Sequence, residues 1–263
     1  MKKLMSLFLV LCLLFVLSGC ENAQIADIKV RGKLIVGVKS DVPDFGYLNP
    51  ENNTYEGLEI DIAKALAKGI LGDEKAISFE PVTSQTRDAK LNNHEVDFII
   101  ATFTITEARK KSYNFTQPYY TDKVGFLVRK DSKITAATDM TGLIPGAARS
   151  STAYTELTKN ENTLLAQIGF WTPIGYNNYE DIWDALVSGK IDVFVADKSI
   201  LRPYLNREME TVLLSENFAE QPYGIATRKT DKQFSAYLNS HLQTMKDDGT
   251  LQQVIDSWVT AEV

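Results

Sequence analysis

The sequence predicts an α/β protein built from two similar units that face each other across a cleft. Short apolar runs of strand length alternate with longer segments whose apolar residues recur at helical spacing. Two stretches, 90–101 and 185–196, share one pattern: a helix end, a short turn, an apolar residue followed by Asp, and a buried strand. Because open α/β sheets bind ligands at the carboxyl ends of their strands, this repeat predicts a binding cleft between the units.

Residues 1–19 are predicted to be a signal peptide that takes no part in the fold. Lys2 and Lys3 precede an apolar run over residues 4–17, which is too short to span a bilayer comfortably. A charged start followed by an apolar run of this length is typical of export signals. The rest of the chain is therefore expected to be extracytoplasmic.

Cys20 is the predicted attachment point of a lipid. Residues 17–20 read Leu-Ser-Gly-Cys, which resembles the lipobox of bacterial lipoproteins and implies cleavage before Cys20 and anchoring at the bacterial cell membrane. The alternative is a plain secretory signal followed by a chance cysteine. The other cysteine, Cys12, lies in the signal peptide, so the mature domain is expected to have no disulfide. Residues 20–30 are polar and mixed, and are expected to form a tether.

The charge of the mature chain excludes some partners. Removing the two lysines of the signal peptide leaves 26 basic and 34 acidic residues, a net charge of −8. An acidic chain without a basic stripe argues against nucleic acid as a partner. The sequence has neither metal-ligand spacing nor a phosphate-binding loop, so neither a metal nor a cofactor is expected.

Strands and helices are predicted to alternate along the first half of the chain, as in a parallel sheet with right-handed crossovers. In chain order, these elements are expected at residues 33–38, 57–71, 77–81, 84–93 and 96–101. The first helix has the clearest signal, because Leu58, Ile62 and Leu66 fall on one face. Further strands and helices are expected at residues 124–129, 143–148, 152–159, 170–174, 179–188, 191–196, 223–227, 234–245 and 251–258.

The segment after the third predicted strand is expected to receive a carboxylate. Thr102 and Thr104 follow that strand, and Thr106 is a good N-cap for the next helix. Hydroxyls, backbone N–H groups and the positive end of a helix dipole therefore meet here. Arg109 in the first helical turn opposes the dipole unless an anion lies between them. The alternative is a surface arginine in an ordinary strand-to-helix connection.

Seven stretches match one protein family in that family's order. They are residues 32–47, 57–66, 96–109, 113–120, 187–197, 221–226 and 248–258. In these stretches the chain resembles the periplasmic-type substrate-binding proteins of ABC transporters for polar amino acids. The resemblance implies a type II periplasmic-binding-protein fold, with two lobes that close on a ligand about two crossover hinge strands. The implied lobes are residues 31–124 plus 222–263, and residues 125–221.

The resemblance also implies roles for individual residues. Thr104 and Arg109 are expected to hold the α-carboxylate of an amino acid, with Arg109 as the bidentate partner. Asp197, at the end of a buried strand, is expected to bind the α-ammonium; the alternative is that it caps its own helix. Thr152 and Ala153 are expected to supply backbone N–H groups.

The side-chain pocket is predicted to favour an acidic amino acid. Lys39 and Arg87 are expected at the mouth of the first lobe, where they would donate charge-assisted hydrogen bonds to a second carboxylate. The motifs around both residues also resemble those of aspartate- and glutamate-binding members. Arg149 is expected to add a positive group from the second lobe, and Tyr223 a wall of the pocket. The alternatives are that these cations are surface charges and that the aromatic residue serves packing.

The leading hypothesis is a monomeric, non-catalytic binding lipoprotein that delivers L-glutamate or L-aspartate to an ABC permease. Binding of glutamine or another polar amino acid is the first alternative. A second is a dehydratase on the same scaffold, which needs a general acid or base in the cleft. Its candidates, Glu59 and Glu180, are interpreted as residues of helix surfaces. A third alternative is the sensor module of a receptor.

Overall fold

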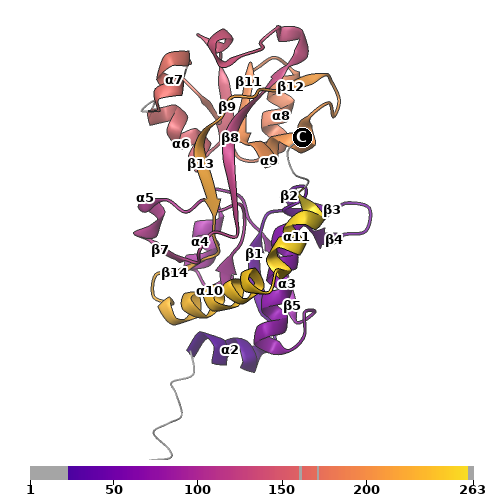
Figure 1. Cartoon of the computed structure of the whole chain (residues 1–263), viewed down its shortest axis with the longest axis vertical. Helices are drawn as coiled ribbons and strands as arrows, with labels where there is room; N and C mark the ends of the chain where they lie inside the picture. The colour runs from indigo at the N-terminus through magenta and orange to yellow at the C-terminus, as the bar shows by residue number, and fades with distance from the viewer. Residues whose placement is uncertain (1–22, 160–161, 171, 260–263) are drawn as a thin grey trace, which may run out of the picture.

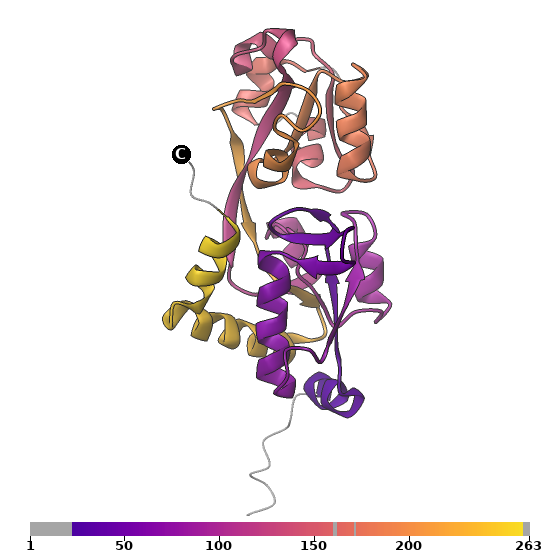
Figure 2. The same ribbon diagram turned by 90° about the vertical axis from the view of Figure 1, so that its right-hand side faces the viewer.

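Two α/β lobes, joined by two long strands, make up the protein. The structure, a computed structural model, describes residues 23–159, 162–170 and 172–259. Strands β8 (Tyr120–Arg129) and β13 (Phe218–Tyr223) run antiparallel to each other between the lobes (Figure 1). In the view of Figure 2, both strands lie along one edge of the molecule. This is the expected two-lobed periplasmic-binding-protein fold with its two crossover strands.

From Ala23 onward, the segment expected to be a tether is a helix. Helix α2 (Ala23–Arg31) buries Ile25 and Ile28 against the first lobe, and the Arg31 guanidinium donates a hydrogen bond to the carboxylate of Asp97. The two isoleucines lie three residues apart, on one helical face, which an argument from mean polarity overlooks. The predicted signal peptide and Cys20 lie outside the described residues.

The first lobe contains a five-stranded sheet of mixed direction. Its strand order is β5-β1-β6-β14-β7. These strands are β1 (Leu34–Val38), β5 (Ile77–Pro81), β6 (Phe98–Ile99), β7 (Tyr113–Phe115) and β14 (Ala226–Arg228). β1 pairs in parallel with β5 and β6, but β14 is antiparallel to both β6 and β7. The three strands expected to form a parallel sheet, β1, β5 and β6, do pair in parallel. The sheet as a whole is mixed, because β14 re-enters this lobe from the second lobe and runs the other way.

Helices cover this sheet, and a small antiparallel sheet lies beside it. The helices are α3 (Leu58–Leu71), α4 (Arg87–Asn92), α5 (Glu107–Lys110), α10 (Lys232–Asp247) and α11 (Thr250–Trp258). The small sheet consists of β2 (Asp41–Val42), β3 (Gly46–Asn49) and β4 (Thr54–Glu56). α3 packs its apolar face, with Ile62 and Leu66, in the same core cluster as Leu238 of α10. The amphipathic pattern of this helix was therefore predicted correctly.

The second lobe repeats the plan with its own sheet, ordered β10-β9-β11-β8-β12. Its strands besides β8 are β9 (Pro145–Ala148), β10 (Ile174–Tyr176), β11 (Val193–Asp197) and β12 (Thr211–Leu213). Its helices are α6 (Thr152–Lys159), α7 (Thr163–Ile168), α8 (Tyr179–Val187) and α9 (Lys198–Leu201), with short 3-10 turns η1 (Lys130–Ser132), η2 (Ala137–Met140) and η3 (Arg202–Tyr204).

Two local expectations were wrong. The strand expected at 170–174 begins only at Ile174, and the helix α7, which was not predicted, precedes it in the chain. Asn162 caps that helix and Gly169 ends it in the left-handed conformation, so the capping signals were present in the sequence. The strand expected at 223–227 is divided between the end of β13 and the start of β14.

Candidate binding site

A small cavity lies between the lobes. The first lobe lines it with Ser84, Arg87, Thr102, Thr104 and Arg109, and the second lobe with Ser151, Thr152, Ala153, Tyr179, Ala196 and Asp197. Several of these residues lie at or just after the carboxyl ends of β6, β9 and β11. The cavity therefore lies where open α/β sheets bind their ligands, as the sequence predicted.

Arg109 joins the lobes at one side of the cavity. Thr106 caps α5 as predicted, because its hydroxyl accepts a hydrogen bond from the Arg109 amide at 3.2 Å. The guanidinium donates to the carbonyl of Thr104 (2.8 Å) and, across the cleft, to the carbonyl of Ser150 (3.1 Å). A guanidinium has five N–H groups, so these two bonds leave donors for an anion.

Arg87 is a buried cation at the wall of the cavity. It is 3% exposed, its Nη1 donates to the carbonyl of Ala101 at 3.3 Å, and its Nε has no hydrogen-bond partner. The guanidinium carbons of Arg87 and Arg109 lie 3.7 and 4.7 Å from the centre of the Phe103 ring, so both cations pack on one aromatic side chain. Within the described residues, Arg87 forms no ion pair. Burial lowers the pKa of Arg87, and burial together with the like charge of Arg87 lowers the pKa of Arg109 to about 9.

Asp197 faces the cavity because another carboxylate caps the helix behind it. Asp197 occupies the N-cap position of α9 but accepts no capping bond. Asp122 of β8 caps the helix instead, accepting hydrogen bonds from the amide (2.9 Å) and hydroxyl of Ser199. The Asp197 carboxylate accepts a bond from the Tyr223 hydroxyl at 2.5 Å. Burial, reinforced by the negative charge of Asp122, raises the pKa of Asp197 to about 7.

Thr102 has an unusual backbone conformation that a buried carboxylate supports. Its φ is 42°, a left-handed value that β-branched residues rarely adopt. The Thr102 amide donates to Glu59 at 2.5 Å, and the Tyr119 hydroxyl donates to the same oxygen at 2.5 Å. The interpretation of Glu59 as a helix-surface residue was wrong: its exposed fraction is 0%, and burial raises its pKa to about 7. Gly57, packed against the backbone of Phe45, marks the buried start of this helix.

The first turn of α6 offers backbone donors to the cavity. The Ser151 hydroxyl accepts a bond from the amide of Tyr154 at 3.1 Å. In the described part of the chain, the amides of Thr152 and Ala153 donate to no protein group. Unpaired amides at the positive end of a helix suit an anion, so this turn and Arg109 together offer donors to a carboxylate.

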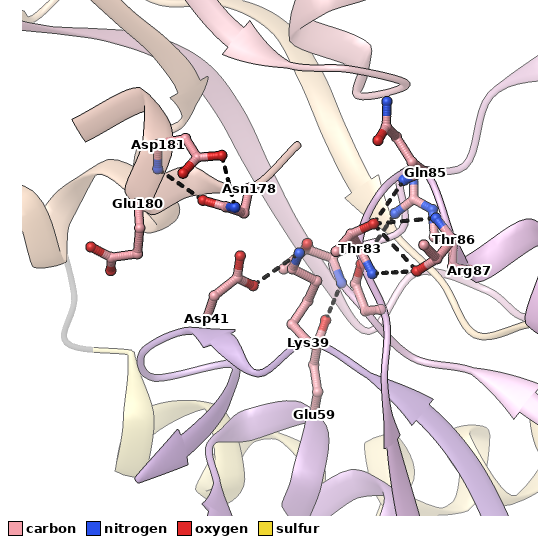
Figure 3. A network of polar contacts seen from close by, with 12 residues as sticks. Lys39, Asp41, Glu59, Thr83, Gln85, Thr86, Arg87, Asn178, Glu180 and Asp181 are labelled. Carbon is pink, nitrogen blue, oxygen red and sulfur yellow. Dashed lines mark hydrogen bonds and ion pairs between the residues drawn. The ribbon is translucent and has the colours of Figure 1, made fainter. Parts of the chain in front are cut away.

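Three predicted site residues do not line the cavity. Lys39 is buried, with 2% exposed, but its ammonium forms an ion pair with Asp41 at 2.9 Å (Figure 3). Asp41 follows Lys39 by two residues and neutralises it locally. Arg149 is exposed and lies over Gly175 on the second lobe. Tyr223 is fully buried behind Asp197, where it packs against other aromatic rings.

The other seven predicted residues do line the cavity: Arg87, Thr102, Thr104, Arg109, Thr152, Ala153 and Asp197. The cavity is also lined by residues that were not predicted: Ser84, Ser151, Tyr179 and Ala196. Tyr179 follows Asn178, the N-cap of α8, and Ala196 precedes Asp197 at the end of β11, so a helix start and a strand end mark these two positions in the sequence. Gln221, which was not predicted either, contacts lining residues of both lobes from behind.

Two lobes, a pair of connecting strands and a cavity between the lobes are the features of a protein that binds a small solute. The family model described as bacterial extracellular solute-binding proteins, family 3, matches residues 34–261. The chain belongs to this family. No helix in the described ranges is long and apolar enough to cross a membrane.

Individual relatives differ in the solute that their names state. The ABC transporter glutamine-binding protein GlnH of Bacillus subtilis is 34% identical over 273 residues, covering 98% of each chain. The glutamine-binding protein of Geobacillus stearothermophilus is 40% identical, covering 81% of this chain and 79% of the relative. The glutamate-binding protein GluB of Corynebacterium glutamicum is 30% identical, covering 86% of this chain and 78% of the relative. The solved structure of an ancestral arginine-binding protein bound to glutamine is 31% identical in sequence with a TM-score of 0.76, and the match covers 88% of this chain and 99% of that one.

Proposed function

We propose that this protein is the binding component of an ABC importer and that its lobes close on L-glutamate or L-aspartate. The argument is one of charge. The cavity is lined by two guanidinium groups and one carboxyl group. An acidic amino acid carries two carboxylates and one ammonium, so it supplies the opposite set of charges. A neutral amino acid leaves one buried guanidinium without a counter-charge, and an uncompensated buried charge costs about 3–5 kcal/mol.

Each charged group of the ligand has a proposed partner. The α-carboxylate binds Arg109 and the unpaired amides of Thr152 and Ala153. The ammonium binds Asp197. The second carboxylate binds Arg87, and this is the observation that carries the proposal: Arg87 is buried at the cavity wall, with a free Nε and no ion pair to a described residue.

Glutamine is the second candidate, because two of the relatives described above are named for it. The carbonyl oxygen of its side-chain amide can accept from Arg87, but its NH₂ group then needs acceptors. Ser84 and Tyr179 line the cavity with hydroxyl groups that can accept. The two candidates therefore differ in whether Arg87 binds a charge or a neutral carbonyl.

Calorimetric titration of the purified protein with glutamate, aspartate and glutamine separates the candidates. We expect at least one acidic amino acid to bind more tightly than glutamine. Arg87→Gln should weaken the acidic ligands about tenfold more than glutamine, since hydrogen bonds to charged groups exceed neutral ones by about 1 kcal/mol or more. Arg149→Gln, which removes an exposed arginine, is the matched control. Tighter binding of glutamine than of both acids, or equal losses in Arg87→Gln, would overturn the ligand assignment.

The proposal extends to the site of action and the quaternary state. We propose a monomer that is anchored by a lipid on Cys20 and docks on a membrane permease, and that binds its ligand without converting it. The lobe boundaries near residues 124 and 221 remain part of the proposal. Membrane fractionation of wild type and Cys20→Ser tests the anchor: the wild type should sediment with membranes and the variant should not.

A further inference from the structure

The glutamine of the hinge strand touches both lobes at once. Gln221 lies on β13, directly opposite Asp122 of β8, and is 1% exposed. Its Oε1 accepts hydrogen bonds from the hydroxyl of Thr104 in the first lobe (2.7 Å) and of Thr152 in the second lobe (2.5 Å). Both threonines line the cavity, whereas Gln221 itself does not. One buried acceptor therefore joins the two walls of the binding site from behind.

The orientation of the Gln221 amide is fixed by a third contact. Its Nε2 donates to the carbonyl of Ala219 at 2.9 Å, and a carbonyl can only accept, so Oε1 must face the two threonines. Ala219 has a φ of 52° at the irregularity where the pairing of β13 with β8 shifts. This backbone conformation costs a residue with a Cβ some free energy and brings the Ala219 carbonyl to the amide. The hinge geometry thus orients the acceptor.

The two threonines respond differently to a hinge motion. Thr104 pairs with Tyr223 through a β-bridge, and the next amide, Ile105, donates to the carbonyl of Pro222 at 2.7 Å. Thr104 is therefore fixed to the hinge strand by the backbone. Thr152 begins α6 of the second lobe and reaches Gln221 only through its side chain. Rotation of the lobes apart breaks the Thr152 bond and leaves the Thr104 bond in place.

We propose that Gln221 is a positioning residue that holds the closed form of the site. It accepts a hydrogen bond from the Thr152 hydroxyl only when the lobes meet, and this bond lowers the free energy of the closed form relative to the open form. Without this acceptor, the Thr152 hydroxyl of the closed form keeps only the longer contact, 3.4 Å, with the Thr104 hydroxyl. Because Gln221 lies outside the cavity, its loss lowers the population of the binding-competent form and weakens every ligand by the same factor. This inference rests on closure around an amino acid and not on which amino acid binds.

Calorimetry on Gln221→Leu, which has a similar volume and no acceptor, tests the proposal. We expect glutamate, aspartate and glutamine, whichever of them bind, to lose about three- to tenfold in affinity by a common factor, as the loss of one hydrogen bond from the closed form predicts. Gln243→Leu, on the exposed face of α10, is the matched control and should bind as wild type. Unchanged affinities in Gln221→Leu, or a loss confined to one ligand, would overturn the proposal.

A double-mutant cycle distinguishes this role from a general structural one. Thr152→Val removes the hydroxyl, so adding Gln221→Leu in that background should change affinity by less than about twofold. An equal loss in both backgrounds would mean that Gln221 acts through something other than Thr152. If Gln221→Leu fails to fold, as judged by thermal unfolding, Thr152→Val alone carries the test. It should weaken every ligand by the same common factor; unchanged affinities, or a loss confined to one ligand, would contradict the proposal.

Discussion

Ligand affinity is expected to fall steeply below neutral pH, because the carboxyl group of Asp197 must be ionised to bind an ammonium. Burial and the charge of Asp122 raise the pKa of this carboxyl to about 7, while Arg87 and Arg109 oppose the shift only in part. With that pKa, about half of the molecules have an ionised Asp197 at pH 7 and about 1% at pH 5. Affinity should therefore weaken about fiftyfold over these two pH units.

The measurement is calorimetric titration at pH 5, 6, 7 and 8 with the tightest-binding amino acid. A glutamate or aspartate side chain is largely ionised across this range, and the pKa of Arg109 stays well above it at about 9. Glu59, whose pKa is also raised to about 7, lies behind Thr102, so a variant that removes only the Asp197 charge is needed to separate the two carboxyl groups. Asp197→Asn has the same shape and does not titrate. Its affinity should be weak and nearly independent of pH.

Two results would refute this reasoning. A wild-type dissociation constant that varies less than about twofold between pH 8 and pH 5 would mean that Asp197 is already ionised at pH 5 or does not bind the ligand. An Asp197→Asn variant with the pH profile of the wild type would assign the titration to another group. Buffers of matched ionic strength are needed, because screening changes all charge interactions.

Three further predictions follow from neighbouring residues. Asp122→Asn keeps an oxygen to cap α9, so stability should change little, but the midpoint of the binding profile should move below pH 7 as the negative charge is lost; an unmoved midpoint would contradict this. Glu59→Gln keeps the acceptor for Thr102. The Glu59 pKa rises from 4.5 to about 7 on folding, so wild-type stability is favoured at low pH and declines as pH rises through 7. Between pH 5 and pH 8, the free energy of unfolding of the variant, measured in urea, should rise by about 2 to 3 kcal/mol relative to that of the wild type. A difference that does not change with pH would be contrary evidence. Gly57→Ala places a Cβ 2.2 Å from the Phe45 carbonyl oxygen at a φ of 125°, whereas the Cβ of Gly72→Ala, at a φ of 79°, meets nothing within 4 Å. In thermal unfolding, Gly72→Ala should lower stability by about 1 kcal/mol and Gly57→Ala by clearly more. Equal losses would show that the close contact at Gly57 relaxes.

Local signals in the sequence predicted much of the fold and part of the site. The Thr106 cap and the apolar face of α3 depend on residues within one or two turns of each other, so spacing alone reveals them. The placement of Arg109, Arg87 and Asp197 at the cavity depends on where strands end, which is also visible in the alternation of elements.

Contacts between distant parts of the chain could not be predicted from spacing. Asp122, and not Asp197, caps α9 by accepting hydrogen bonds from Ser199, which is 77 residues away in the chain. No local pattern indicates this contact. Glu59 belongs to an acidic first turn that is usual at a helix surface, yet this helix start is enclosed by the lobe. The prediction of Lys39 as a cavity residue failed for a local reason. Asp41, which neutralises Lys39, is only two residues away, so spacing alone could have indicated this ion pair.

The position of β14 in the first sheet constrains the order in which the protein can acquire its structure. β14 lies between β6 and β7, and β7 has no other neighbour in that sheet. Because the chain is synthesised from its N-terminus, every strand of the second lobe's sheet is made before residue 226. The lobe that begins first is therefore completed last, and until then its half-built sheet exposes an open strand edge to unwanted association.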